Sequence, residues 1–360
     1  MRPLPDFPWD TLAPYREQAS GHPGGLVDLS IGTPVDPTPV IVRQALADAS
    51  DAPGYPATYG TPGLRSAAVE WLARRFGIAG LDALGVLPTI GSKELVGWLP
   101  VLLGMAQRDV VVYPRLAYPT YEIGARLAGA QAMATDSLTA VGPARVGLVW
   151  VNSPANPHGR VLPAEHLAKV VAWARERGAI VASDECYLEF GWDVQPVSVL
   201  DPAVNGGTLD GILTVHSLSK RSNLAGHRAG VVVGDVQLVH RLLEIRKHAG
   251  MMVPTPIQGA IVAALGDDAH VDEQRSRYAA RRSSLRTAFE SAGFRLDYSE
   301  AGLYLWVTRD EPCWKTAGWL AERGILVAPG EFYGSAGAHH VRVALTATDA
   351  HVRAAAQRLA

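Results

Sequence analysis

The chain has 360 residues, of which 48% are hydrophobic and 19% are charged, and its formal net charge is -2. This composition excludes a predominantly disordered chain, which would combine low hydrophobicity with high net charge. The near-neutral balance also argues against nucleic acid or an anionic membrane as a partner, because proteins that bind these usually carry a basic excess. Only two cysteines are present, Cys186 and Cys313. We expect two free thiols and no metal site.

The N-terminus lacks the apolar stretch of a secretory signal peptide. The longest apolar run, around 96–106, is shorter than the roughly 20 residues that a membrane-spanning helix needs. We therefore expect a cytoplasmic protein, and an enzyme.

Residues 1–38 are rich in proline and glycine and predict an irregular arm. Amphipathic helices and short apolar strands then alternate, which is typical of a largely parallel sheet that is buried on both faces. The predicted helices span 39–49, 62–76, 92–105 and 163–177. The predicted strands span 109–113, 146–151, 179–183, 212–215 and 229–233.

Beyond residue 236 the pattern changes to long helices followed by separated strands. The predicted helices are 236–249, 256–265, 270–292 and 349–359, and the strands are 303–307, 325–328 and 341–345. We predict an α/β protein in three parts. These are an arm (1–38) that contributes to the small domain and to a dimer, a large domain (39–245) and a small α+β domain (246–360).

Polar clusters directly follow three of the predicted strands: Asn152–Gly159, Asp184–Tyr187 and His216–Lys220. A fourth, Gly91–Lys93, precedes a predicted helix. Ligands of open α/β sheets bind beyond the carboxyl ends of the strands, so we expect these clusters to form one site.

The chain contains five lysines, and two of them, Lys93 and Lys220, belong to these clusters. Lys169, Lys247 and Lys315 are expected on the surface. Lys220 comes directly off an apolar strand, where partial desolvation would lower the pKa of its amine and make it nucleophilic.

Four motifs in order along the chain resemble those of the class I aminotransferases, which have pyridoxal 5′-phosphate (PLP) fold type I. They are Tyr-Gly-x-x-Gly-Leu-Arg at 59–65, Asn-Pro-x-Gly at 156–159, Asp-x-x-Tyr at 184–187, and Ser-x-x-Lys at 217–220 followed by Arg228. The resemblance implies that fold type, with a mainly parallel sheet and a smaller α+β domain, and it implies PLP as the cofactor.

The resemblance also implies roles around the cofactor ring. Lys220 would hold PLP and later move a proton, and Asp184 would pair with the pyridinium nitrogen. Tyr187 and Asn156 would hydrogen-bond the ring's 3′-oxygen. Tyr118 would stack on the face of the ring.

The cofactor phosphate, by the same resemblance, would be bound by Ser217, Arg228 and the backbone N–H groups of Ser92 and Lys93. Tyr55 would reach this phosphate from a neighbouring subunit, which implies a homodimer.

The substrate's α-carboxylate would be bound by Arg342, with the backbone of Gly32 close by and Asn156 beside it. Taken singly, each of these residues also has an ordinary structural reading. Asp184 could cap a helix, and Arg342 alternates with two valines and could lie on a solvated strand face.

The compact length, the segment 247–254 and the proline-rich arm look like actinobacterial N-succinyldiaminopimelate aminotransferases. This implies transfer of an amino group between N-succinyl-LL-2,6-diaminopimelate and 2-oxoglutarate or glutamate, in lysine and diaminopimelate biosynthesis. Arg115, His22 and Lys247 are candidate cations for the distal carboxylate. An aspartate or aromatic amino acid aminotransferase is the alternative.

A different enzyme class also has a Ser-x-x-Lys motif, namely the acyl-enzyme hydrolases such as penicillin-binding proteins and β-lactamases. These need Ser-Asp-Asn and Lys-Thr-Gly further along the chain. Here Ser183-Asp184-Glu185 lies upstream, and the run at 315–317 lacks the glycine. We therefore disfavour this function.

Overall fold

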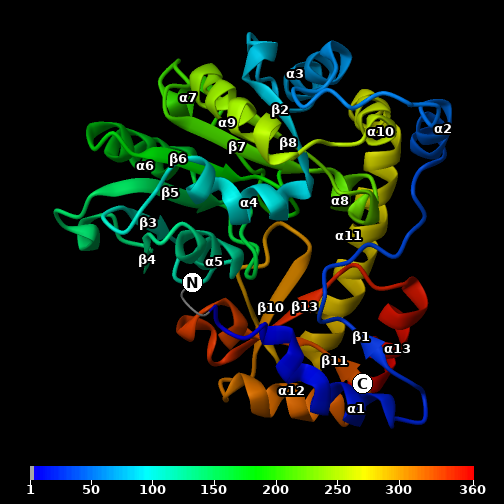
Figure 1. Ribbon diagram of the computed structural model, residues 1–360. Coiled ribbons are helices and arrows are strands. Elements are labelled where there is room, and N and C mark those ends of the chain that lie inside the picture. The colour runs from blue at the N-terminus through cyan, green and yellow to red at the C-terminus, as the bar shows by residue number, and fades with distance from the viewer. Residues whose placement is uncertain (1–3) are drawn as a thin grey trace.

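The computed structural model describes residues 4–360, and its upper part in Figure 1 is built on a seven-stranded sheet. The strand order is β2 (Val86–Ile90), β8 (Ala229–Gly234), β7 (Ile212–Ser217), β6 (Ile180–Asp184), β5 (Val146–Asn152), β3 (Val110–Tyr113) and β4 (Gln131–Ala134). β8 pairs antiparallel with both of its neighbours, β2 and β7, whereas the other neighbouring strands of this sheet pair in parallel. The predicted α/β class with a mainly parallel sheet is confirmed.

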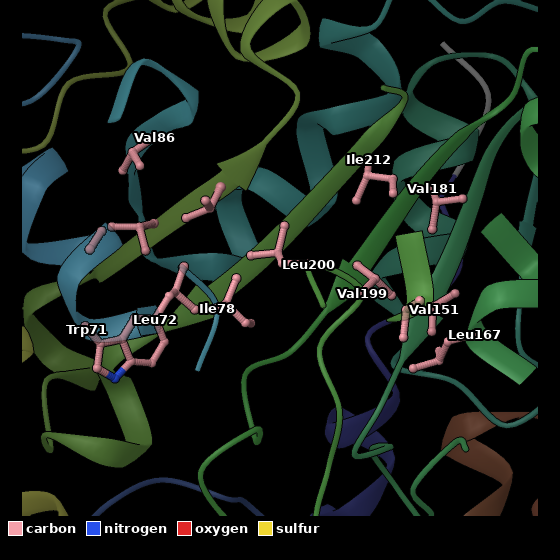
Figure 2. Close-up of a cluster of buried hydrophobic side chains, with 14 of the residues drawn as sticks. Trp71, Leu72, Ile78, Val86, Val151, Leu167, Val181, Val199, Leu200 and Ile212 are labelled. Atoms are coloured by element: carbon pink, nitrogen blue, oxygen red, sulfur yellow. The ribbon is translucent and has the colours of Figure 1, made fainter. Parts of the chain in front are cut away.

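Successive residues of the central strands enter two different hydrophobic cores, one on each face of the sheet. Val149 and Val151 of β5 belong to the core that Figure 2 shows, whereas Leu148 and Trp150 belong to the opposite one. This alternation is what a strand covered on both faces requires. The first core is closed by α3 (Pro62–Phe76), α6 (Ala164–Glu176) and α10 (Thr255–Gly266), and the second by α4 (Gly91–Leu102), α5 (Thr120–Leu127) and α9 (Val236–Ala249).

A second, antiparallel sheet lies below the first in Figure 1, with the strand order β12 (Ala328–Pro329), β13 (His340–Ala344), β10 (Tyr304–Thr308) and β9 (Arg295–Asp297). Beside it, β1 (Val27–Asp28) pairs in parallel with β11 (Ile325–Leu326). Two helix pairs pack here, α1 (Ala13–Ser20) with α12 (Cys313–Ala321) and α11 (Ala269–Ser291) with α13 (Asp349–Leu359). The arm thus contains a short helix and a strand.

The domain boundary between 245 and 246 stays a prediction. Helix α10 follows that boundary, yet it packs against α2 (Val40–Asp48) and α3, which precede it. The remaining helices are α7 (Pro202–Asn205) and α8 (Leu218–Arg221). Short 3-10 turns lie at Pro8–Leu12, Ala83–Gly85, Thr139–Val141, Ala225–His227, Gly330–Tyr333 and Ser335–Gly337.

The sequence pattern misses nine helices and strands of the structure: α1, β1, β2, α5, β4, α7, α8, β9 and α12. β2 contains Pro88, α5 has only eight residues, and most of β4 is exposed at the sheet edge. The strand expected at 325–328 is divided between β11 and β12, and the helix expected at 92–105 ends at Leu102. Both cysteines are free, as expected. No helix in the described part of the chain is long and apolar enough to span a membrane.

Candidate active site

The carboxyl ends of β5, β6 and β7 lie side by side and bring three of the predicted polar clusters to one edge of the sheet. Asn152 at the end of β5 is in register with Asp184 at the end of β6, and Asp184 is in register with Val215 of β7. The Asn152 side chain also donates a 2.9 Å hydrogen bond to the Asp184 carbonyl. The backbone pairing of the parallel strands therefore fixes where each cluster begins.

Asp184 is buried and has two hydrogen-bond donors. Its Oδ2 accepts from the hydroxyl of Tyr121 at 2.8 Å, and its Oδ1 accepts from the backbone N–H of Cys186 at 3.2 Å. Burial raises the pKa of the Asp184 carboxyl, while these hydrogen bonds act in the opposite direction. Tyr121 was not predicted from the sequence, although it is the second tyrosine of the Tyr-Pro-Thr-Tyr run that begins at Tyr118.

Arg342 of β13 is 3% exposed, so the solvated-face reading of this residue is wrong. Its Nη1 donates to Oδ1 of Asn156 at 2.9 Å, and its Nη2 donates to the carbonyl of Ser30 at 2.7 Å. The guanidinium carbon lies 3.9 Å from the ring centroid of Tyr304 and 4.9 Å from that of Tyr333. Its Nε is buried and has no hydrogen-bond partner among residues 4–360. Arg342 thus joins the arm, the second sheet and the loop after β5.

Tyr187 follows β6 and is buried with its hydroxyl 2.9 Å from that of Tyr304. Gly32 of the arm lies against Tyr304, because a Cβ built on this glycine would lie 2.3 Å from Tyr304 Oη. Tyr304 was not singled out from the sequence. The one available signal was its position in the predicted strand 303–307.

Lys220 lies in α8, and Ser217 caps this short helix by accepting from the N–H of Ser219 at 3.2 Å. Burial lowers the pKa of the Lys220 amine, whereas Tyr304 and Cys186 act to raise it. A lysine that loses its proton more readily is a better nucleophile, which agrees with the lowered pKa predicted for Lys220 from the sequence.

The N-terminus of α4 and Arg228 form a cationic cradle. Gly91 has φ +70°, and a Cβ there would lie 2.3 Å from Nη2 of Arg228, so only glycine fits without displacing the guanidinium. Ser92 and Lys93 occupy the first turn of α4, where backbone N–H groups have no acceptor within the helix. Desolvation and the charge of Arg228 lower the pKa of Lys93. The arrangement suits an anion.

Tyr118 and Tyr55, the two tyrosines predicted to contact the cofactor's ring face and phosphate, differ in exposure. Tyr118 packs edge-on against Tyr121, with ring centroids 5.9 Å apart, and burial raises its pKa to about 12. Tyr55 is 96% exposed, so the single chain does not pack it into this site.

The three candidate cations for a distal carboxylate are separated. Arg115 precedes Ala117, whose N–H donates to the carbonyl of Tyr333 at 2.9 Å, so this loop adjoins the Arg342 site. His22 instead accepts from the N–H of Gly24 on the arm. Lys247 pairs with Glu244 at 2.6 Å on the exposed side of α9.

A family model described as aminotransferase class I and II matches residues 25–359. The chain belongs to this family. A relative from Streptomyces rimosus, 4-dedimethylamino-4-oxo-anhydrotetracycline transaminase OxyQ, is 60% identical over 359 residues and covers 100% of both chains. A probable aminotransferase from Mycobacterium tuberculosis is 62% identical, covering 99% of this chain and 85% of its own.

A solved structure from Thermus thermophilus, titled as a probable N-succinyldiaminopimelate aminotransferase, matches with a TM-score of 0.88 and 27% identity, covering 98% of this chain and 99% of its own. Together with the family match, this confirms the predicted PLP fold type I. The acyl-enzyme reading of the Ser-x-x-Lys motif has no support from these relatives.

Aminotransferases of this family depend on PLP, and the residues of this chain fit that cofactor. Asp184 is a buried carboxylate at a strand end, suited to a ring nitrogen that carries a proton. Lys220 offers an amine whose pKa burial lowers. The cradle of Gly91 and Arg228 leaves no room for a Cβ and presents donors to a phosphate.

Proposed function

We propose that this aminotransferase moves an amino group between N-succinyl-LL-2,6-diaminopimelate and 2-oxoglutarate, within lysine and diaminopimelate biosynthesis. The observation that carries the proposal is the guanidinium of Arg342, which Asn156 and the arm hold in place and whose buried Nε has no partner among residues 4–360. A fixed guanidinium suits the carboxylate that amino acids and 2-oxo acids share. The similarity to the solved Thermus thermophilus protein, a probable N-succinyldiaminopimelate aminotransferase, supports the choice of substrate.

The roles of the side chains follow from their chemistry. PLP, when bound, supplies an electron sink for the carbanion formed at the substrate's Cα. Nζ of Lys220 would bind the cofactor and, once released, take the proton from Cα. The Asp184 carboxylate would keep the ring nitrogen protonated. Tyr187 and Asn156 would hydrogen-bond the ring's 3′-oxygen.

The phosphate would bind in the cradle, held by Ser217, Arg228 and the N–H groups of Ser92 and Lys93. Tyr118 would cover the ring face. These assignments rest on matching the family's motifs to residues that surround one sheet edge, and substitution of Lys220 tests them first. Lys220→Ala should abolish both the absorption band of the lysine-bound cofactor and turnover, whereas Lys169→Ala on the exposed side of α6 should retain both.

Among the three cations suggested for the distal succinyl carboxylate, we propose Arg115. Its loop adjoins the Tyr333 segment that faces Arg342, whereas His22 is held on the arm by Gly24. Arg115→Ala should raise KM for the succinylated substrate about tenfold, as expected for the loss of one exposed charge pair of about 1 kcal/mol or somewhat more. The matched control is Arg126→Ala, because Arg126 pairs with Glu122 on the surface of α5. An unchanged KM in Arg115→Ala would remove this assignment.

We further propose a homodimer in which Tyr55 reaches the partner's cofactor phosphate. Its 96% exposure supports this, since an aromatic side chain so exposed on one chain is available to a second. Light scattering should give twice the mass of one chain, and Tyr55→Phe should weaken PLP binding without changing that mass. A monomer with full activity would contradict the proposal.

A second candidate substrate is a polycyclic ketone, because OxyQ is similar to this chain over its whole length. Aspartate and aromatic amino acids remain the alternatives among amino donors. The deciding experiment adds each amino donor to the PLP-loaded enzyme and follows the band of the lysine-bound cofactor. The ketone accepts an amino group, so it is supplied together with a donor and its amination is measured directly. Loss of the band with N-succinyl-LL-diaminopimelate supports the proposal. Loss only with aspartate or an aromatic amino acid, or amination only of the oxo-anhydrotetracycline, replaces the substrate and keeps the reaction class.

A further inference from the structure

Tyr304 contacts two of the side chains that the proposed function uses, Tyr187 and Arg342. Its hydroxyl lies 2.9 Å from the hydroxyl of Tyr187, and its ring faces the Arg342 guanidinium at 3.9 Å. It is 4% exposed. Tyr304 is also among the groups that act on the pKa of Lys220, which it raises.

The position of the Tyr304 ring is set by strand pairing. In the antiparallel pair of β10 and β13, Tyr304 is opposite Ala344 and Arg342 is opposite Trp306. Tyr304 and Arg342 are therefore diagonal neighbours on one face of the sheet, at a separation that long side chains span. The guanidinium carbon lies over the rings of both Tyr304 and Tyr333, 3.9 Å and 4.9 Å from their centroids, which is cation–π distance.

The position of the Tyr304 hydroxyl is set by the arm. A Cβ at residue 32 would lie 2.3 Å from this oxygen, so the phenol occupies the space that a side chain at Gly32 would fill. The hydroxyl is thereby held against Tyr187. If Tyr304 donates in this pair, the proton of Tyr187 is left for an acceptor on its other side.

We propose that Tyr304 is a positioning residue with two separable actions: its ring orients Arg342 for the substrate carboxylate, and its hydroxyl orients the proton of Tyr187 toward the cofactor's ring oxygen. This inference rests on the proposed function of Arg342 and Tyr187. The two actions belong to different atoms of one side chain, so two substitutions separate them.

Tyr304→Phe removes the hydroxyl and keeps the ring. A hydrogen bond donated to Tyr187 strengthens the one that Tyr187 donates onward. Its loss should move the pH midpoint of the absorption change of the lysine-bound cofactor upward by about 0.5–1 unit, as for one hydrogen bond of about 1 kcal/mol. This readout needs no substrate. The affinity for succinate, a dicarboxylate that cannot react, should change less than about threefold, because the ring over Arg342 remains.

Tyr304→Leu also removes the ring. The affinity for succinate should fall about tenfold or more beyond the effect of Tyr304→Phe, as expected for a desolvated cation–π contact. KM for the amino acid should rise by a similar factor, with a smaller change in kcat. The amount of bound cofactor gives the number of correctly folded sites. Partial misfolding of this variant therefore does not affect the measured affinity for succinate. Tyr278→Phe is the matched control, because Tyr278 is fully buried and its hydroxyl has no partner among residues 4–360.

Different outcomes test the proposed function and the two actions of Tyr304. Absence of a lysine-bound band in the unmodified enzyme would defeat the proposed function itself. A normal band with the same pH midpoint in Tyr304→Phe would overturn the action of the hydroxyl. An unchanged affinity for succinate in Tyr304→Leu would overturn the action of the ring.

Discussion

The hydroxyl of Tyr121 donates a 2.8 Å hydrogen bond to Oδ2 of Asp184, and both side chains are buried. Tyr121 is held in place by stacking on Trp150 of β5, with ring centroids 4.9 Å apart. A residue of α5 is thus fixed on the sheet in the position that supports the carboxylate at the end of β6.

Tyr121→Phe should weaken PLP binding by roughly 10- to 100-fold, the range expected for one hydrogen bond to a charged group. The pKa of Asp184 is already raised by burial, and losing a donor raises it further, so the carboxylate is ionised less readily. Equilibrium dialysis against PLP at neutral pH measures the effect. Tyr15→Phe, on α1, should bind PLP normally. Equal affinity in both variants would exclude support of Asp184 by Tyr121.

Gly91→Ala should weaken binding of PLP but not of pyridoxal, which lacks the phosphate. The new Cβ would meet Nη2 of Arg228 at 2.3 Å and displace a cation of the cradle. Gly104→Ala is the matched control, because Gly104 also has positive φ, +73°, but has open space around it. Both variants carry backbone strain of about 1–2 kcal/mol, so only their difference reports on the phosphate. If Gly91→Ala lost similar affinity for PLP and for pyridoxal, the proposed phosphate-binding role of the cradle would be contradicted.

Glu185 and His216 form a buried pair of titratable groups behind the site, with Oε2 and Nε2 3.9 Å apart. Burial raises the pKa of Glu185 to about 7 and lowers that of His216 to about 3. Both are therefore neutral in mildly acid solution, and no ion pair forms. The stabilising contribution of Glu185 is present below its ordinary pKa of 4.5 and is lost as the pH rises through about 7. His216 acts in the opposite sense, since its neutral folded form gains stability as the pH rises from about 3 to 6.5.

Glu185→Gln should therefore gain about 2–3 kcal/mol in the free energy of unfolding, relative to the unmodified chain, between pH 5 and pH 8. The amide can still accept the 2.9 Å hydrogen bond from the N–H of Val199. Urea unfolding at the two pH values measures the difference. Glu176→Gln, exposed at the end of α6, should show the same pH dependence as the unmodified chain. A constant difference between Glu185→Gln and the unmodified chain would show that Glu185 titrates normally.

Arg281 of α11 pairs with two carboxylates of different exposure, Asp36 of the arm and Asp349 of α13, whose side chains are 11% and 63% exposed. Asp36→Asn should lower the free energy of unfolding by about 3 kcal/mol, because it leaves a buried guanidinium partly unpaired. Asp349→Asn should cost about 0–1 kcal/mol, as an exposed pair does. Urea unfolding compares the two variants directly.

The loss in the free energy of unfolding that Asp36→Asn causes should depend on pH. Burial tends to raise the pKa of Asp36, but hydrogen bonds from Arg281 and Gln274 outweigh it and the pKa is lowered. Its contribution is present above the ordinary value of 3.8 and is lost as the pH falls through the lowered pKa. The difference between Asp36→Asn and the unmodified chain should therefore shrink in acid. Equal costs for the two variants at neutral pH would mean that burial does not distinguish them.

Much of the fold could be predicted because each central strand carries its own signal. The apolar runs of β5, β6 and β7 mark strands buried on both faces, and polar residues begin where these runs end. Asp184 and Lys220 were proposed as site residues in this way, from local sequence alone. Tyr121 and Tyr304 were not, because each lies in or beside an apolar run and has an ordinary packing role as its simplest reading.

The class of the sheet and the family of the chain could be predicted from the sequence alone. The contacts of Arg342 could not. This residue is 186 residues from Asn156 and 312 from Ser30, and it contacts both. Alternation along β13 placed Arg342 on one face of its strand, but it did not show whether water or protein covers that face. That depends on the register and packing of elements far apart in the chain, which the periodicity of a single strand does not encode.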